Sequence, residues 1–358
     1  MELESNTDSE RALASVQIVE QVVNHDNADT LELATVLGWQ VVVSKAENVK
    51  AGDRIVFCEI DSLLPGDALW LPPAIAKKVG TQANQKWFRV QTVKLRGELS
   101  QGLILTGVAH EVLAFDIGTN VTSHLGIEKY EPNVDGIGEG GGVKRANPYP
   151  FPTSVLDKTD EPRVQSSPKL LKLIQGLPFY VTVKHDGTSV TFLLHPNSQE
   201  FMVCSRNQYR PRPPDVELDR PDNVYWRIAV ENDIETKLRT FFPYYAIQGE
   251  ICGPSIQKNL LGLKAATLHV FNIVDTRYRR SLGFDEMCAV TEKLGLKCVE
   301  FVEQGDAFAY ATIKDLLVLA EGKYPNTKNE REGIVVRSKD RKISFKVISN
   351  KYLIKNNY

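Results

Sequence analysis

A glycine- and proline-rich segment divides this chain into two parts of different character. Residues 136–142 read Gly-Ile-Gly-Glu-Gly-Gly-Gly, and residues 147–152 read Asn-Pro-Tyr-Pro-Phe-Pro. Glycine runs are flexible and proline-rich runs are extended and stiff, so neither continues a packed element. Because such segments usually separate domains, we expect residues 1–127 and 159–358 to form two domains joined by a linker over 128–158.

The composition narrows the class of protein. The 358 residues are 42% hydrophobic and 25% charged, as in an ordinary globular protein. No apolar run approaches the length of a membrane span, and the acidic first ten residues resemble neither a secretory signal nor a transit peptide. The five cysteines have no paired spacing, which predicts reduced thiols in an intracellular compartment and no zinc cluster. The compartment itself stays open, and we expect a monomer.

Charge is balanced overall and uneven locally. The net charge is −2, which does not by itself indicate a nucleic-acid binder. Residues 335–358, however, carry seven basic side chains against one acidic side chain. The basic residues alternate with apolar ones, so this segment is expected to fold and to present its charge to a polyanion or a phosphate. A solubilising tail is the alternative.

The first part of the chain reads as all-β. Residues 38–44, 53–59 and 86–93 are apolar or alternating runs typical of strands, with glycine-containing turns between them. Several short strands in about 100 residues favour a small closed barrel of the OB type. Residues 27–31 and 95–103 resemble the OB-fold tRNA-binding modules appended to some synthetases. A barrel that only packs on its neighbour is the alternative.

The second part mixes helices and strands. Apolar residues at helical spacing predict helices over 224–242 and 312–320. Strands are predicted at 245–250, 268–274 and 333–337. This pattern indicates an α+β domain built on antiparallel sheets.

One strand of the second part delivers a lysine into a tight turn. Residues 179–184 form an apolar, β-branched run that ends in Lys184, and Asp186-Gly187 follows as the turn. Burying an ammonium is costly, so we expect Lys184 to be held as a neutral amine that can act as a nucleophile. A hairpin with a solvated lysine is the alternative for so short a motif.

Five further segments follow Lys184 in a fixed order. They are Ser-Arg-Asn at 205–207, Gln-Gly-Glu-Ile-Cys-Gly-Pro at 248–254, Phe-Asn-Ile-Val-Asp at 271–275, Glu-Gly-Ile-Val-Val-Arg at 332–337 and Ser-Phe-Lys-Val-Ile at 344–348. Together with Lys-x-Asp-Gly they resemble the six motifs of covalent nucleotidyltransferases, the superfamily of polynucleotide ligases and capping enzymes. Six motifs in one order are far more specific than any one of them.

The resemblance implies a nucleophile and two phosphate-binding cations. Lys184 would attack the α-phosphate of ATP, form a lysyl-N–AMP bond and release pyrophosphate. Lys346 and Arg206 would hold phosphate charge, one as a point charge and the other as a planar fork. A pairing of Arg206 with a surface acid is the alternative for that residue.

The resemblance also implies a metal site and a base-stacking residue. Asp186, Glu250 and Glu332 would organise Mg²⁺ or Mn²⁺ directly or through water, because these cations prefer oxygen ligands. Phe271 would stack on adenine, and Glu250 could also accept a hydrogen bond from a ribose hydroxyl. The alternatives are an exposed turn residue for Glu332 and a core side chain for Phe271.

The order of the two parts selects a group within the superfamily. ATP-dependent DNA ligases and capping guanylyltransferases carry an OB domain after the last motif, whereas here the barrel-like part comes first. This order resembles the RNA ligases typified by the enzymes of Deinococcus and Naegleria. Residues 159–165, Thr-Asp-Glu-Pro-Arg-Val-Gln, also resemble that group, in which this segment contributes an arginine to the nucleotide site, here Arg163.

We therefore expect an α+β chain with an N-terminal OB-like β-barrel domain. The C-terminal nucleotidyltransferase domain would have ATP-grasp-like antiparallel sheets with flanking helices. The implied function is ATP-dependent ligation of an RNA 3′-hydroxyl to a 5′-phosphate, at free ends or in a nicked duplex, with no membrane partner. A DNA or mixed-duplex nick ligase and a non-catalytic RNA-binding protein with a decayed ligase domain stay open.

Two positions depart from the superfamily pattern. Ser189 stands where ligases of the DNA type usually carry arginine, and Ser344 stands at the first position of a motif that often reads Lys-x-Lys. Phosphate neutralisation is therefore expected to depend on Lys346, with help from Lys342 or Lys351.

Overall fold

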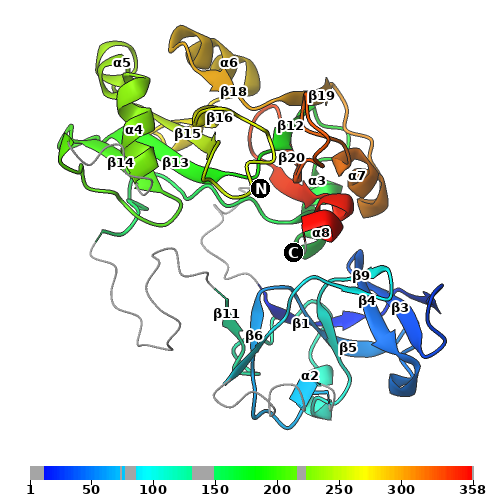
Figure 1. The fold of residues 1–358 in the computed structure, drawn as a ribbon. Coiled ribbons are helices and arrows are strands. Elements are labelled where there is room, and N and C mark those ends of the chain that lie inside the picture. The colour runs from blue at the N-terminus through cyan, green and yellow to red at the C-terminus, as the bar shows by residue number, and fades with distance from the viewer. Residues whose placement is uncertain (1–11, 73–74, 77–85, 131–148, 216–222, 357–358) are drawn as a thin grey trace. The chain divides into compact units, whose positions relative to one another are not determined.

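The computed structural model describes residues 12–72, 75–76, 86–130, 149–215 and 223–356. Internal packing divides the chain into two compact units: the first comprises residues up to Gly140 together with Asn356–Tyr358, and the second comprises Gly141–Lys355 (Figure 1). Each unit has its own hydrophobic clusters. Among the described residues, no helix is both long and apolar enough to span a bilayer.

The first unit is built from short antiparallel strands. β1 (Ala14–Ile18), β5 (Arg54–Cys58) and β10 (Leu103–Leu105) form one sheet, and β2 (Gln21–Asn24), β3 (Leu31–Val36) and β4 (Trp39–Ser44) form another. β6 (Ser62–Pro65), β7 (Trp87–Arg89) and β11 (Glu128–Lys129) form a third, β8 (Val93–Leu95) pairs with β9 (Glu98–Ser100), and α2 spans His110–Leu113. The alternation predicted for residues 38–44 is present, because every second residue of β4 is buried.

Turn geometry explains the hairpins of this unit. Leu37 and Gly38 both have positive φ, 51° and 73°, which suits the tight turn that joins β3 to β4. The predicted strand at 86–93 is divided, because β7 pairs with β6 and β8 turns away to pair with β9.

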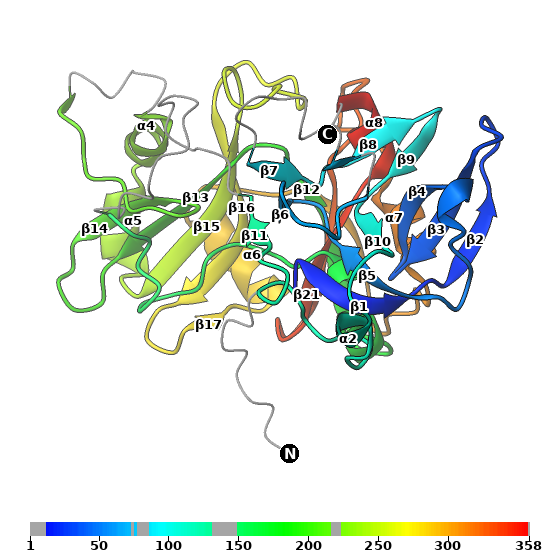
Figure 2. The same cartoon turned by 90° about the horizontal axis from the view of Figure 1, so that it is seen from below.

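The described residues of the second unit form two sheets. The larger has the order β14–β13–β15–β16–β17, with β18 parallel to β16, and the smaller has the order β19–β12–β20–β21. Figure 2 shows β13, β15 and β16 running side by side in this unit. The strands of the larger sheet are β13 (Thr188–Leu194), β14 (Phe201–Ser205), β15 (Tyr245–Cys252), β16 (Thr267–Asp275), β17 (Arg280–Ser281) and β18 (Lys297–Cys298). Those of the smaller are β12 (Phe179–Lys184), β19 (Phe301–Gly305), β20 (Gly333–Ser338) and β21 (Ser344–Ile348).

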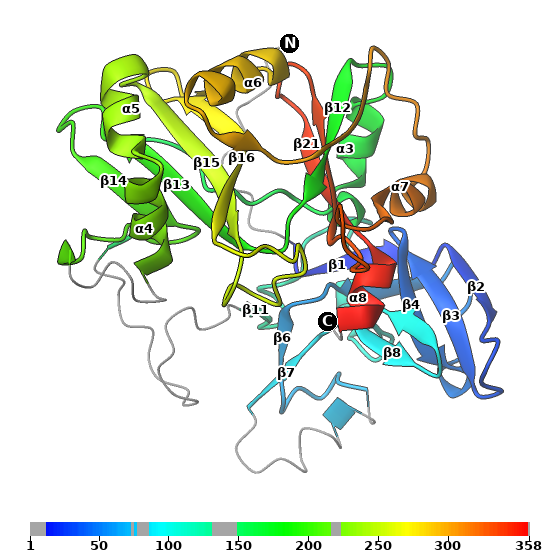
Figure 3. The same cartoon turned by 45° about the horizontal axis from the view of Figure 1, so that its top comes forward.

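Helices bury one face of each sheet. α4 (Val224–Glu231), α5 (Ile234–Phe241) and α6 (Phe284–Lys293) contribute to the core of the larger sheet, which includes Phe192 and Trp226. α3 (Pro168–Leu173) and α7 (Ile313–Ala320) pack on the smaller sheet, as Figure 3 shows for the neighbourhood of β12, and α8 spans Asn350–Asn356. The α+β class predicted from the sequence is confirmed. The helix predicted over 224–242 is two helices, because Asp233 adopts the left-handed conformation (φ 50°) between them.

The proposed linker is only partly visible. Its glycine run at 136–142 lies outside the described residues. Phe151, Val155 and Leu156 are buried against Leu193 and Met202 on the larger sheet. The last part of the segment assigned to the linker thus already packs within the second unit.

Candidate active site

Lys184 is the last residue of β12 and lies opposite the start of β20. The register pairs Lys184 with Gly333, so Glu332, the residue before β20, comes next to the lysine. Lys184 Nζ lies 2.8 Å from each carboxylate oxygen of Glu332. Their side chains are 25% and 16% exposed, so the pair is accessible from one side but largely shielded from water. Glu332 is therefore not a solvated turn residue.

Tyr324 fixes the two backbone segments that carry this pair. Its buried hydroxyl accepts hydrogen bonds from the backbone N–H of Asp186 (3.1 Å) and of Glu332 (3.2 Å). The same hydroxyl donates to the carbonyl of Lys184 (3.2 Å). One side chain thus joins the turn after β12 to the entrance of β20. Sequence reasoning did not identify Tyr324, and no motif indicates it.

The glycine of Lys-x-Asp-Gly lets the turn approach the larger sheet. A Cβ on Gly187 would meet the backbone carbonyl of Ile251 and would lie 2.7 Å from Cys252 Sγ. Only glycine allows so close an approach. In this position the turn adjoins Glu250, which pairs with Ser189 across β15 and β13. Glu250 therefore belongs to the same group of side chains as Lys184.

The prediction of a neutral Lys184 is wrong for the protein in this state. Burial disfavours the ammonium, but the negative charges of Glu332, Glu250 and Asp186 outweigh burial and raise the pKa of Lys184 above its ordinary value. The motif supplies Lys184 and Asp186, whereas Glu250 and Glu332 come from two other segments. The free protein consequently holds Lys184 as an ammonium in an ion pair.

The three carboxylates around Lys184 suit a hard divalent cation. Burial, with help from Glu332 and Asp186, raises the pKa of Glu250 to about 8 although Lys184 opposes the shift. Burial followed by Glu332 also raises the pKa of Asp186, and the buried Oδ2 of Asp186 makes no hydrogen bond to any described residue. Crowded carboxylates with unused oxygen atoms are the donor set that Mg²⁺ and Mn²⁺ prefer. Asp186, Glu250 and Glu332 thus fit the metal role that the sequence implies for them.

A second group of charges joins Lys346 and Arg206 through one acid. Asp160 lies 3.3 Å from Lys346 Nζ and also pairs with the Arg206 guanidinium. Burial, reinforced by the neighbouring cations Lys184, Arg163 and Arg206, lowers the pKa of Lys346 to about 8, although Asp160 opposes the shift. Lys346 and Arg206, the two predicted phosphate-binding residues, therefore share the carboxylate of Asp160.

Arg163 lies beside this group. It forms a parallel β-bridge with Lys346, and the Lys346 N–H donates to the carbonyl of Pro162. The segment Thr159–Arg163 is thereby attached to β21. The family resemblance indicates Arg163 in this segment, but no sequence motif indicates Asp160.

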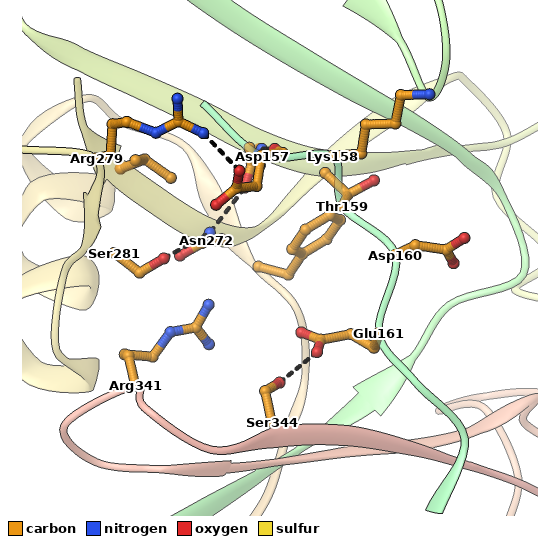
Figure 4. A pocket seen from close by; sticks show the side chains of 13 residues that line it. Asp157, Lys158, Thr159, Asp160, Glu161, Asn272, Arg279, Ser281, Arg341 and Ser344 are labelled. Atoms are coloured by element: carbon orange, nitrogen blue, oxygen red, sulfur yellow. Dashed lines mark hydrogen bonds and ion pairs between the residues drawn. The ribbon is translucent and has the colours of Figure 1, made fainter. Parts of the chain in front are cut away.

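Phe271 lines a polar cavity. The cavity has a volume of about 180 Å³ and opens between residues 157–161, β16, β17 and the start of β21. Figure 4 shows Arg279 bonded to Asp157, Asn272 directed at Ser281, and Ser344 bonded to Glu161 around it. Phe271 is half-buried, and its place in the lining removes the alternative that it is a core side chain.

The predicted residues thus form three adjoining groups. Lys184 is surrounded by Asp186, Glu250 and Glu332. Lys184 lies close enough to Lys346 for their charges to repel, and Lys346 shares Asp160 with Arg206. Asp160 in turn lines the cavity that Phe271 lines. A carboxylate cluster, a cationic pair and an aromatic-lined cavity are therefore contiguous, and all of them lie in the second unit.

The two helper lysines expected from the sequence lie elsewhere. Lys342 pairs with Asp340, and Lys351 pairs with Glu321. Ser344 stands where the Lys-x-Lys motif has its first lysine, and its hydroxyl donates a hydrogen bond to Glu161.

Comparison with known proteins places both parts of the chain. A family model described as RNA ligase matches residues 177–353, and an OB-fold domain model matches residues 13–106. A stretch of 92 residues, 25% of the chain, is 32% identical to the phenylalanine–tRNA ligase beta subunit of Geobacter metallireducens. The chain spans only 9% of that protein, so the match concerns one module.

Solved structures of one enzyme match nearly the whole chain. Naegleria gruberi RNA ligase with PPi has a TM-score of 0.81 and 32% identity, over 97% of this chain and 99% of that one. A lysine-to-methionine mutant of the same enzyme with AMP and Mn has 33% identity and a TM-score of 0.81, over 96% and 99%. A lysine-to-alanine mutant with ATP and Mn has 32% identity and a TM-score of 0.80, over 96% and 98%.

Identity of about a third along almost the full length of both chains, with the same domain order, exceeds what a shared fold alone requires. The expected N-terminal OB fold and the expected resemblance are both confirmed. The chain belongs to the RNA ligase family.

Proposed function

We propose that this chain is an ATP-dependent RNA ligase whose nucleophile is Lys184. The observation that carries the assignment is the position of this lysine, next to three carboxylates and adjoining the Lys346–Arg206 pair and the Phe271 cavity. Structures of the Naegleria enzyme with ATP and Mn, with AMP and Mn and with PPi support ATP and a divalent metal as its cofactors.

In the first step Lys184 forms a bond from Nζ to the α-phosphorus of ATP, and pyrophosphate leaves. Because Lys184 is an ammonium in the free protein, it must first lose a proton. Glu332 contacts Nζ at 2.8 Å and is placed to accept that proton. Asp186, Glu250 and Glu332 would hold a divalent cation, which would supply positive charge against the phosphate oxygens.

The remaining groups bind and orient the nucleotide. The Phe271 cavity suits the base, and its amide and carboxylate groups offer donors and acceptors to it. Lys346 and Arg206 can bind the phosphates once the phosphates have displaced Asp160 from the two cations. Arg163, on the segment bonded to β21, is proposed to reach the same nucleotide.

Ligation then needs two further transfers. AMP passes from Lys184 to the 5′-phosphate of an RNA end, and the RNA 3′-hydroxyl attacks that phosphate with loss of AMP. We propose that the OB-fold domain holds the strand with the 3′-hydroxyl, because OB folds bind single strands by stacking and backbone contacts. Action on a nicked duplex, a monomeric state, an intracellular location and domain limits near 127 and 159 are parts of this proposal.

Joining assays test the substrate and the division of labour. Nicks with RNA or with DNA at the 3′ side should differ, with joining much faster where the 3′ end carries ribose. A chain that lacks residues 1–120 should still take up labelled AMP and should lose strand joining. Equal joining of both nicks would contradict the RNA assignment, and loss of both activities in the truncated chain would contradict the domain roles.

A further inference from the structure

Two histidines and a glutamate meet beside the turn that follows Lys184. His185 comes directly after the lysine, His269 belongs to β16, and Glu300 immediately precedes β19. One potential ligand atom from each lies within 4.8 Å of the other two. The hydrogen bond from Val183 N–H to the Glu300 carbonyl (2.8 Å) brings the segment of Glu300 to the end of β12.

The imidazoles of this cluster are buried with unused nitrogen atoms. The side chain of His185 is fully inaccessible, and among the described residues its Nδ1 has no hydrogen-bond partner. His269 is 6% exposed, and neither of its ring nitrogens makes a hydrogen bond of ordinary geometry within the described part of the chain. Leaving a buried polar atom unbonded costs about 1–3 kcal/mol, so such atoms usually have a reason.

An ion pair alone accounts for only part of the cluster. His185 Nε2 contacts Glu300 Oε2, which satisfies one nitrogen of one ring. His269 meets His185 edge-on, with ring centroids 4.5 Å apart and planes at 82°. The Cys298 backbone lies near His269 but makes no hydrogen bond of ordinary geometry to it. A neutral imidazole at this position offers a nitrogen lone pair to a metal ion.

We propose that His185, His269 and Glu300 bind a Zn²⁺ ion, with water completing its coordination. Two imidazoles and one carboxylate form a donor set that zinc commonly takes. The set differs from the oxygen-only group of Asp186, Glu250 and Glu332, which selects Mg²⁺ or Mn²⁺. The chain thus holds two neighbouring metal sites with different preferences.

The position of the zinc site assigns it a positioning role. A bound ion links the end of β12, the middle of β16 and the segment before β19, and one of its ligands is the residue next to Lys184. It fixes the turn that carries the nucleophile without touching the nucleotide. The Glu300 side chain is 34% exposed, which gives the ion a route from solvent.

Metal binding tests this site without any use of ligase activity. Full-length protein is freed of metal with a chelator, returned to buffer with excess Mg²⁺ to occupy the oxygen-only group, and titrated with Zn²⁺ by calorimetry. The expected result is one Zn²⁺ per chain with a dissociation constant of about 1 µM or below. Co²⁺ should occupy the same site and give visible absorption bands, and these bands should disappear when Zn²⁺ displaces the Co²⁺.

Substitutions identify the ligands. His269→Gln should weaken Zn²⁺ binding by about 100-fold or more, since even a lost outer-shell partner costs 10- to 100-fold. His110→Gln, at an exposed histidine in the first unit, is the matched control and should bind as the wild type does. His269→Cys keeps a zinc ligand at this position and should retain most of the affinity, which separates lost coordination from misfolding.

Two results would overturn the proposal. The first is wild-type protein that takes up no Zn²⁺ in the presence of Mg²⁺, which needs no variant to be decisive. The second is Zn²⁺ binding that persists in His269→Gln but disappears in Asp186→Asn, which would place the ion at the oxygen-only group. Neither result bears on whether Lys184 accepts AMP, so this site and the proposed function can fail separately.

Discussion

Lys184 and Glu332 form a two-oxygen ion pair between the end of β12 and the entrance of β20, with Nζ 2.8 Å from each carboxylate oxygen. The pair couples the proposed nucleophile to one of the proposed metal ligands. A lysine held in this way stays an ammonium and is not nucleophilic. It becomes reactive only when it loses its proton, either to Glu332 or after Glu332 has left it to bind a cation. The pair therefore sets the first requirement of the reaction.

Replacing Glu332 by Gln should nearly abolish adenylylation of Lys184. The change removes a proton acceptor and a metal-ligating oxygen, and a loss of about 100-fold or more is expected from the proton-transfer role alone. The rate of AMP uptake under single-turnover conditions measures the effect. Glu321→Gln, which removes only the partner of Lys351, is the control and should leave the rate unchanged. A Glu332→Gln rate within threefold of the wild type would contradict the assigned role.

Affinity for ATP should fall as the pH rises past about 8. The pKa of Lys346 is lowered to about 8, mainly by burial. Below that pH the side chain is an ammonium that attracts phosphate, and above it the charge is lost. Calorimetric titration with ATP from pH 7 to pH 9.5 checks this sign.

A matched variant isolates Lys346 in that experiment. Arginine stays charged throughout this pH range, so Lys346→Arg should bind ATP with a much flatter pH dependence. If both proteins lose affinity along the same curve, another group is responsible and Lys346 does not bind phosphate as proposed.

Replacing Asp160 by Asn should tighten ATP binding. Asp160 neutralises Lys346 and Arg206 in the free protein, so the nucleotide must displace it before the cations can reach phosphate. Removing this competition is expected to lower the dissociation constant by up to about tenfold, which corresponds to about 1.4 kcal/mol. Weaker binding in Asp160→Asn would show that the acid holds the two cations in their productive positions instead.

Tyr324→Phe should destabilise the protein and slow adenylylation. The change leaves the N–H groups of Asp186 and Glu332 without their shared acceptor, at a cost of about 1–3 kcal/mol. Urea unfolding gives the free-energy change. Tyr310→Phe removes one half-buried contact, to Glu303, and should cost less. Equal losses in the two variants would argue against a special position of Tyr324.

Much of the second unit could be predicted because its signals are local. The apolar run before Lys184 and the strands at 245–250, 268–274 and 333–337 appear with small changes of boundary. The six motifs identified most of the site residues, because each motif lies at the end of a strand or within one. Local patterns did not foresee the break of the 224–242 helix at Asp233, since a single residue in the left-handed conformation leaves little trace in the apolar spacing.

The electrostatics of the site could not be predicted in the same way. The neutral Lys184 expected from its burial is wrong, because its charge state depends on Glu250 and Glu332, which lie far away in sequence. Asp160 and Tyr324 act through partners on other strands, and no residue pattern records those contacts. The cluster of His185, His269 and Glu300 is likewise assembled from segments far apart in sequence.

Intact and peptide mass spectrometry after incubation with ATP and Mg²⁺ tests the central claim most directly. The account predicts a single AMP adduct on Lys184, which disappears with EDTA and is absent in Lys184→Ala. An adduct on another lysine, or none on a folded wild-type protein that binds ATP, would contradict it.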